Sequence, residues 1–124
     1  AAGADVNARN NAGLTPLHWA ARFGHEAVVA ALLGTLPVAA HAAAVNVRDN
    51  DGLTPLHWAA VNDRVGVVRA LLGAGANKAL RDVRGYTAAD LAREYGYADV
   101  ARMIEQYQPE AAAAAAAGAA AGPA

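Results

Sequence analysis

The sequence has no cysteine and no serine. Without cysteine there can be no disulfide framework and no thiolate metal site. Without either residue, a nucleophile of the Ser–His or Cys–His kind is excluded. An excess of charge of one sign is missing too, because 11 acidic residues stand against 10 basic ones and no basic patch is visible. A nucleic-acid partner is therefore not expected.

Long runs of bulky apolar residues are absent as well. The hydrophobic fraction is 56%, but most of it is alanine. No stretch of about 18 bulky apolar residues occurs, so we expect no membrane partner. The chain also opens without the Met, the basic segment and the apolar segment of a secretory signal. We therefore expect an intracellular, cytoplasmic location, with an organelle reached by a removed transit peptide as the alternative.

One stretch of nine residues is present twice. Gly-Leu-Thr-Pro-Leu-His-Trp-Ala-Ala occupies residues 13–21 and residues 52–60, and the degenerate copy Gly-Tyr-Thr-Ala-Ala-Asp-Leu-Ala-Arg occupies residues 85–93. The second and third copies begin 33 residues apart, and the first and second begin 39 residues apart. A period of 33 residues and a Thr-Pro-Leu-His motif closely resemble the ankyrin repeat family. The resemblance covers residues 1–107 and implies an all-α solenoid of stacked helix-turn-helix units with short β-hairpin loops.

The motif also predicts where helices begin and end. Thr15 is placed to cap a helix with Pro16 in its first turn. Gly24 suits the left-handed conformation of a helix end, so we expect a helix from Pro16 to Phe23. In the second copy Asp63 stands where the first has Gly24, and aspartate tolerates that conformation better than most residues.

Each of the first two repeats is expected to continue with a second helix, which in the first repeat spans His25 to Leu33. Apolar residues at i, i+3 and i+4 spacing predict one buried stripe on each of these helices. The stripe residues are Val28, Val29, Leu32 and Leu33 in the first repeat, and Val67, Val68, Leu71 and Leu72 in the second.

These patterns divide the chain into five segments. Residues 1–9 resemble the end of a truncated repeat, which suggests a fragment of a longer protein. Residues 10–48 form a repeat with a six-residue insertion, residues 49–81 a second repeat, and residues 82–107 a C-terminal capping repeat. Residues 108–124 form an Ala/Gly-rich tail, which we expect to be disordered, because a helix there would have no bulky face to bury.

The histidines and tryptophans of the repeated motif allow both structural and functional interpretations. For His18 and His57 we favour the role that the resemblance implies, hydrogen bonding to the threonine and to backbone, because a metal site would need further converging ligands. For Trp19 and Trp58 we favour core packing between the helices over a cage for a methylated lysine. Trp58→Ala is then expected to cost roughly 3–5 kcal/mol.

No pattern in the sequence predicts catalysis. Acids such as Asp49, Asp82 and Asp90 fall at turn or cap positions of the repeat, and the resemblance implies that Asp49 and Asp82 brace the loops. The glycines lie at turns and helix ends and do not form a phosphate-binding Gly-x-Gly-x-x-Gly arrangement. We therefore expect no enzyme, no cofactor and no metal.

The remaining signal lies at positions that the repeat leaves free. In the family these are the loop tips and the ends of the first helices, which line a concave groove. Here they are Asn11, Leu14, Asn50, Asp51, Leu53, Arg84 and Tyr86 in the loops, and Arg22, Phe23, Val61, Asn62, Glu94 and Tyr95 on the helices. Aromatic residues and arginine are typical of interface cores.

These positions favour a non-catalytic protein–protein interaction module, an adaptor or scaffold that binds another protein in the groove. One alternative is a structural subunit or peripheral component of a larger assembly, which the inserted loop and the tail would contact. The other is the regulatory repeat region of a longer enzyme.

Overall fold

The computed structural model describes residues 8–107. Within these residues it contains seven α-helices, one 3-10 helix and no strand, which confirms the all-α class. The expected β-hairpin loops are present as tight turns without paired strands. The helices are α1 Pro16–Phe23, α2 Glu26–Gly34, η1 Val38–Ala40, α3 His41–Val45, α4 Pro55–Val61, α5 Val65–Gly73, α6 Ala88–Glu94 and α7 Ala98–Gln106.

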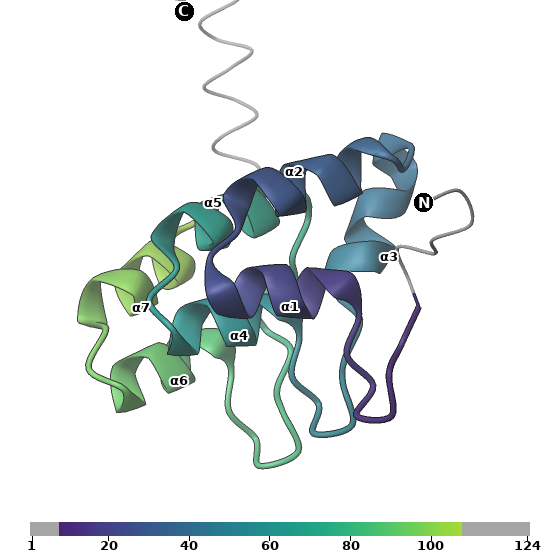
Figure 1. Cartoon of the computed structure of the whole chain (residues 1–124). Coiled ribbons are helices and arrows are strands. Elements are labelled where there is room, and N and C mark those ends of the chain that lie inside the picture. The colour runs from purple at the N-terminus through teal and green to yellow at the C-terminus, as the bar shows by residue number, and fades with distance from the viewer. Residues whose placement is uncertain (1–7, 108–124) are drawn as a thin grey trace, which may run out of the picture.

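The helices form two layers. Helices α1, α4 and α6 pack side by side in one layer, and α2, α5 and α7 pack behind them in the other (Figure 1). Each α1–α2, α4–α5 and α6–α7 pair is one helix-turn-helix unit. The loops that precede α1, α4 and α6 project to the same side of the stack (Figure 1).

Local sequence explains the helix boundaries. Thr15 is the N-cap residue of α1, and its amide donates to Nδ1 of His18 at 3.0 Å. At the equivalent position before α4, the Thr54 hydroxyl accepts a hydrogen bond of 3.3 Å from the His57 amide. Gly24 ends α1 with φ of 74°, and Asp63 ends the turn after α4 with φ of 58°, both in the left-handed region. Both predictions of a left-handed helix end are confirmed.

The core lies between the layers and between successive units. Val67, Val68, Leu71 and Leu72 are all buried, which confirms the stripe on α5. The stripe on α2 is only partly confirmed, because Val28 is 46% exposed. In the same helix, Val29 and Leu33 are buried and Leu32 is half-buried. The α5 stripe is covered by α2, whereas no described unit packs on the opposite side of α2.

The insertion after α2 is folded. It forms η1 and α3, and Ala44 and Val45 of α3 belong to the buried core. His41 closes the loop, because its Nε2 atom lies 2.8 Å from the carbonyl oxygen of Leu33 at the end of α2. The Asn46 side chain donates to the Gly75 carbonyl at 3.1 Å, so the insertion also contacts the next repeat.

The outer face of the last described unit, α6 and α7, carries charged side chains. Arg93 pairs with Asp90 at 2.9 Å and with Glu105 at 2.5 Å. The Lys78 ammonium group donates to the Tyr107 carbonyl at 2.7 Å at the end of α7. These contacts join α6, α7 and the loop before α6 on that outer face.

Two expectations fall outside the described residues: the truncated repeat end, apart from its last two residues, and the disordered tail. Within residues 8–107, no single helix is long and apolar enough to cross a membrane. Taken together, Glu26–Gly34 and Val38–Val45 have the length and composition of a membrane span, but the pair is bent by 116°.

Candidate protein-interaction surface

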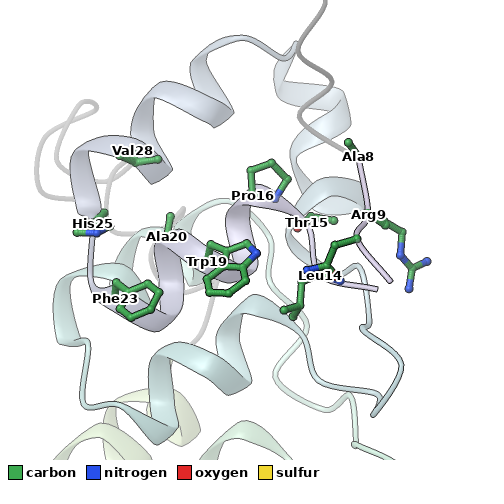
Figure 2. A pocket seen from close by; sticks show the side chains of 11 residues that line it. Ala8, Arg9, Leu14, Thr15, Pro16, Trp19, Ala20, Phe23, His25 and Val28 are labelled. Atoms are coloured by element: carbon green, nitrogen blue, oxygen red, sulfur yellow. The ribbon is translucent and has the colours of Figure 1, made fainter. Parts of the chain in front are cut away.

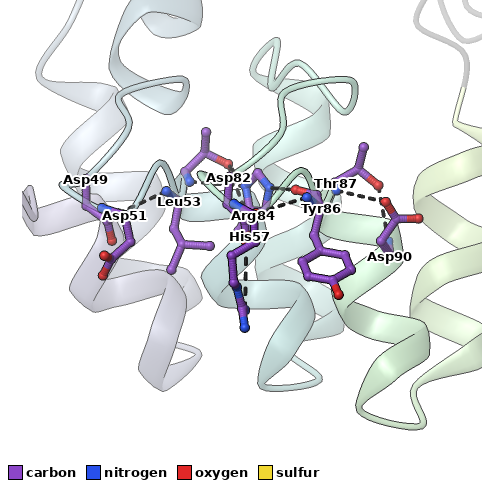
Figure 3. A network of polar contacts seen from close by, with 10 residues as sticks. Asp49, Asp51, Leu53, His57, Asp82, Arg84, Tyr86, Thr87 and Asp90 are labelled. Atoms are coloured by element: carbon purple, nitrogen blue, oxygen red, sulfur yellow. Dashed lines mark hydrogen bonds and ion pairs between the residues drawn. The ribbon is translucent and has the colours of Figure 1, made fainter.

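His57 joins two repeats through both nitrogens of its ring. Its Nδ1 atom accepts a hydrogen bond of 3.2 Å from the Thr54 amide, and its Nε2 atom lies 3.0 Å from the Tyr86 carbonyl oxygen in the next repeat (Figure 3). Because Nδ1 accepts, the proton must be on Nε2, which donates to that carbonyl. His18 makes the equivalent contacts with Thr15 and Leu53. The expected hydrogen-bonding role of both histidines is confirmed.

Burial of the two imidazole rings also affects their protonation. Desolvation lowers the pKa of His18 and of His57 below the ordinary value of 6.5, and this outweighs the raising effect of their backbone hydrogen bonds. Each imidazole is therefore held neutral, with both nitrogens engaged. Among the described residues, no group of three or more His, Cys, Asp or Glu side chains is placed to hold a metal ion.

The loops are braced by Asp49 and Asp82. One Asp82 carboxylate oxygen accepts hydrogen bonds of 2.9 Å from the amides of Arg84 and Tyr86 (Figure 3). The Asp49 carboxylate does the same for its own loop. Successive loops are also joined, because the Val83 amide donates to the Asp51 carbonyl at 3.0 Å. The loop tips are thereby fixed relative to one another.

Arginines at one position of the repeat form a second brace that sequence reasoning missed. Arg9 and Arg48 each join two loops, and Arg81 donates to the Gly85 carbonyl at 2.8 Å within its own loop. Arg9 donates to the Gly13 carbonyl at 3.2 Å and to the Arg48 carbonyl at 2.6 Å. Arg48 repeats the pattern with the carbonyls of Gly52 and Arg81. The signal was present, because Arg9, Arg48 and Arg81 each stand six residues before the threonine of the motif.

None of the predicted groove residues is buried. Those on the exposed surface are Asn11, Arg22, Phe23, Asn50, Asp51, Arg84, Glu94 and Tyr95. Those half-buried are Leu14, Leu53, Val61, Asn62 and Tyr86. The structure thus leaves the whole set accessible along the loops and the adjoining ends of α1, α4 and α6.

Four of these residues gather at the C-terminal end of the surface. The Arg84 guanidinium lies 5.2 Å from the centre of the Tyr86 ring. Both residues line a hollow of about 230 Å³ together with Leu91, Glu94 and Tyr95. Tyr95 is 59% exposed. An aromatic and charged hollow of this kind is suited to contacts with a protein side chain.

At the N-terminal end, Trp19 corrects a prediction. It was expected in the core but is 42% exposed, with its ring stacked on Phe23 at 5.8 Å between centres. Trp58 agrees better with the prediction of core packing, because it is half-buried against the core. Its indole N–H donates to the Asp49 carboxylate at 3.0 Å. The two differ because α1 covers α4, while no described helix covers α1 on its other side.

A second hollow of about 540 Å³ adjoins these rings (Figure 2). Leu14, Pro16, Trp19, Phe23 and Val28 supply most of its bulky apolar wall. It was not expected from the sequence, because the motif alone does not show whether a neighbouring unit covers these side chains.

The stacked helix pairs and the hydrogen-bonded loops define a helical-repeat solenoid. A family model described as ankyrin repeats (3 copies) matches residues 1–82 and residues 39–113. The chain therefore belongs to the ankyrin repeat family, whose members are generally protein–protein interaction modules. No curated protein sequence matches it.

Proposed function

We propose that this chain is a non-catalytic adaptor or scaffold module that binds a partner protein through its concave surface. That surface consists of the loops before α1, α4 and α6 together with the ends of these helices. The observation that carries the proposal is the rigid alignment of the loops, through Asp49, Asp82 and the arginine brace. A surface ordered before binding loses less conformational entropy on association.

The side chains on this surface support the same proposal. Phe23 is 46% exposed and Tyr95 is 59% exposed, at opposite ends of the row of helices. Arg22 and Arg84 lie over aromatic rings beside them. Aromatic residues and arginine are the types most often found where an interface contributes its affinity.

The test compares two triple variants of the full chain. One carries Phe23→Ala, Tyr86→Ala and Tyr95→Ala on the concave surface. The control carries Val65→Ala, Arg69→Ala and Arg102→Ala on α5 and α7. After thermal melts show that both variants fold as the parent does, quantitative mass spectrometry compares the proteins that each retains from a cell extract.

A partner kept by the parent and the control but lost by the concave-surface variant supports the proposed function. Identical retention by all three contradicts it. The assembly alternative rests on Val38, which is 82% exposed in the folded insertion. Loss of a partner on Val38→Asp, with the concave-surface variant unaffected, favours that alternative.

A further inference from the structure

Arg22 is surrounded by aromatic rings from two repeats. The carbon at the centre of its guanidinium lies 5.7 Å from the centre of the Trp19 ring, 5.2 Å from that of Phe23 and 5.4 Å from that of Trp58. Two of these rings stack on each other, and the third is fixed by its bond to Asp49. Cation–π attraction to several rings restricts where the guanidinium can point.

The charge of Arg22 has no counterpart in the described part of the chain. Within residues 8–107 its guanidinium forms neither an ion pair nor a hydrogen bond, and the residue is exposed. Arg9, Arg48 and Arg81 each donate to backbone carbonyls instead. The planar donors of Arg22 therefore face solvent in a position that the rings hold.

An apolar hollow lies directly beside this charge. Trp19 and Phe23 line the hollow of about 540 Å³ (Figure 2). The same two rings contact the guanidinium of Arg22, which does not itself line the hollow. The hollow has room for one bulky side chain or more. A ligand that suits both features carries a negative group next to an apolar side chain.

We propose that the occupant of this site is a segment of the partner protein in which an aspartate or glutamate adjoins a bulky apolar residue. The carboxylate accepts paired hydrogen bonds from Arg22, and the apolar side chain enters the hollow between Trp19, Phe23 and Val28. This inference rests on the proposed function, because Leu14, Arg22 and Phe23 belong to the concave surface. Trp19 and Val28 extend the site onto the side of α1 and α2 that no described unit covers.

A carboxylate fits better than a phosphate group. A planar guanidinium pairs with a carboxylate through two parallel hydrogen bonds. A doubly charged phosphate is usually held by a cluster of cations. Two other arginines lie near this site, but both are engaged: Arg64 donates to the Arg22 carbonyl at 3.1 Å, and Arg9, which lines the hollow, donates to the carbonyls of Gly13 and Arg48. Among these three arginines, only Arg22 has a guanidinium with no hydrogen-bond partner within residues 8–107.

The test selects random peptides displayed on phage against the immobilised full chain. The enriched peptides are synthesised with a fluorescent label, and fluorescence polarisation gives their affinity for the parent, Arg22→Gln, Arg22→Lys and Phe23→Ala. Arg69→Gln is the matched control, because the Arg69 side chain is exposed, forms no hydrogen bond or ion pair within residues 8–107, and lies on α5, away from the rings. Each peptide is also made with its acid replaced by the amide.

The expected peptides contain an acid next to a bulky apolar residue. Arg22→Gln and the acid-to-amide change each weaken binding by at least about tenfold, and together they weaken it no further. Arg22→Lys recovers only part of the loss, and Arg69→Gln leaves binding unchanged.

Three outcomes overturn the inference. Peptides that need Phe23 but tolerate both Arg22→Gln and the amide leave the proposed function standing without the carboxylate. Tighter binding of a phosphothreonine peptide than of its glutamate counterpart assigns the site to phosphate. If no selected peptide loses affinity for the triple variant at Phe23, Tyr86 and Tyr95, the proposed function falls as well.

Discussion

The ring of His57 donates a hydrogen bond of 3.0 Å to the backbone carbonyl of Tyr86, 29 residues further along the chain. This contact ties helix α4 to the loop of the next repeat. Asp90 holds the equivalent position in the last repeat, where its carboxylate accepts from the Thr87 amide at 3.0 Å and pairs with Arg93 on its own helix. The hydrogen bond to the next repeat is thus made by histidine, and among the described residues the aspartate at the equivalent position bonds only within its own repeat.

Replacing His57 with alanine is expected to lower the free energy of unfolding by about 2–3 kcal/mol, because a buried side chain and its hydrogen bonds to Thr54 and Tyr86 are lost. The Tyr86 carbonyl then keeps only the hydrogen bond of 2.8 Å from the Asp82 amide. Urea unfolding followed by circular dichroism measures the change. Asp90→Ala removes only a helix cap and is expected to cost about 1 kcal/mol. Equal losses for the two variants would contradict the role assigned to the histidine.

Stability is expected to fall as the pH drops below the ordinary histidine value of 6.5. The pKa values of His18 and His57 are lowered in the folded state, so below that pH the unfolded chain binds more protons than the folded one. Their contribution is complete above the unfolded pKa and is lost between it and the lowered folded values. Urea midpoints between about pH 7.5 and pH 5 measure the slope.

The control for this slope is the double variant His18→Asn, His57→Asn. It is less stable at neutral pH, but its stability should change less over the same interval. An identical slope in the parent and the double variant would assign the pH dependence to other groups.

Arg48→Ala is expected to cost about 1 kcal/mol, because two backbone carbonyls in adjacent loops lose their donor. Arg48→Lys should recover little of this, since an ammonium group cannot reproduce the fork of a guanidinium. Arg69→Ala, on the exposed side of α5, should be neutral. Thermal unfolding compares the three, and a full recovery by lysine would show that charge alone matters.

Trp58→Ala and Trp19→Ala are expected to differ although the two residues occupy the same place in the repeat. The half-buried Trp58 also bonds to Asp49, so its loss should cost about 2–4 kcal/mol, somewhat less than full burial would give. Trp19 is 42% exposed, and its loss should cost less than about 1 kcal/mol. Matched urea titrations decide, and equal costs would place Trp19 in the core after all.

Gly52→Ala is expected to destabilise the fold by at least about 2 kcal/mol. Gly52 has φ of 79°, and a Cβ atom there would lie 2.9 Å from the Val83 amide nitrogen, which bonds the loops together. Gly34→Ala, in the open at the end of α2, should instead stabilise by about 0.5–1 kcal/mol. Thermal melts of both test the pair, and a loss at both sites would mean that loop packing is not the cause.

The features predicted correctly from the sequence are those that one repeat fixes by itself. The cap at Thr54, the left-handed ends at Gly24 and Asp63, and the histidine contacts all follow from a few neighbouring residues. Such features recur wherever the motif recurs. The helices and their order were therefore predictable, and the family assignment followed from them.

The features missed depend on what lies beyond the repeat. Trp19 and Trp58 lie in identical nine-residue stretches, yet only the second has a described unit packed on its N-terminal side. Val28 and Val67 differ for the same reason, at 46% and 1% exposed. The contacts of His41 with the carbonyls of Leu33 and Leu36 could not be predicted either, because nothing in the sequence shows how the insertion folds back. The groove residues themselves stay predictions until a partner is tested.

The charged face formed by Arg93, Asp90 and Glu105 has a consequence for how this protein can change over generations. All three residues belong to the last described unit, so their ion pairs do not depend on how many units come before it. Duplication of a coding segment for residues 49–81 would lengthen the surface by one loop and one helix end. The charged face of α6 and α7 would be inherited unchanged, so the surface would lengthen without altering these ion pairs.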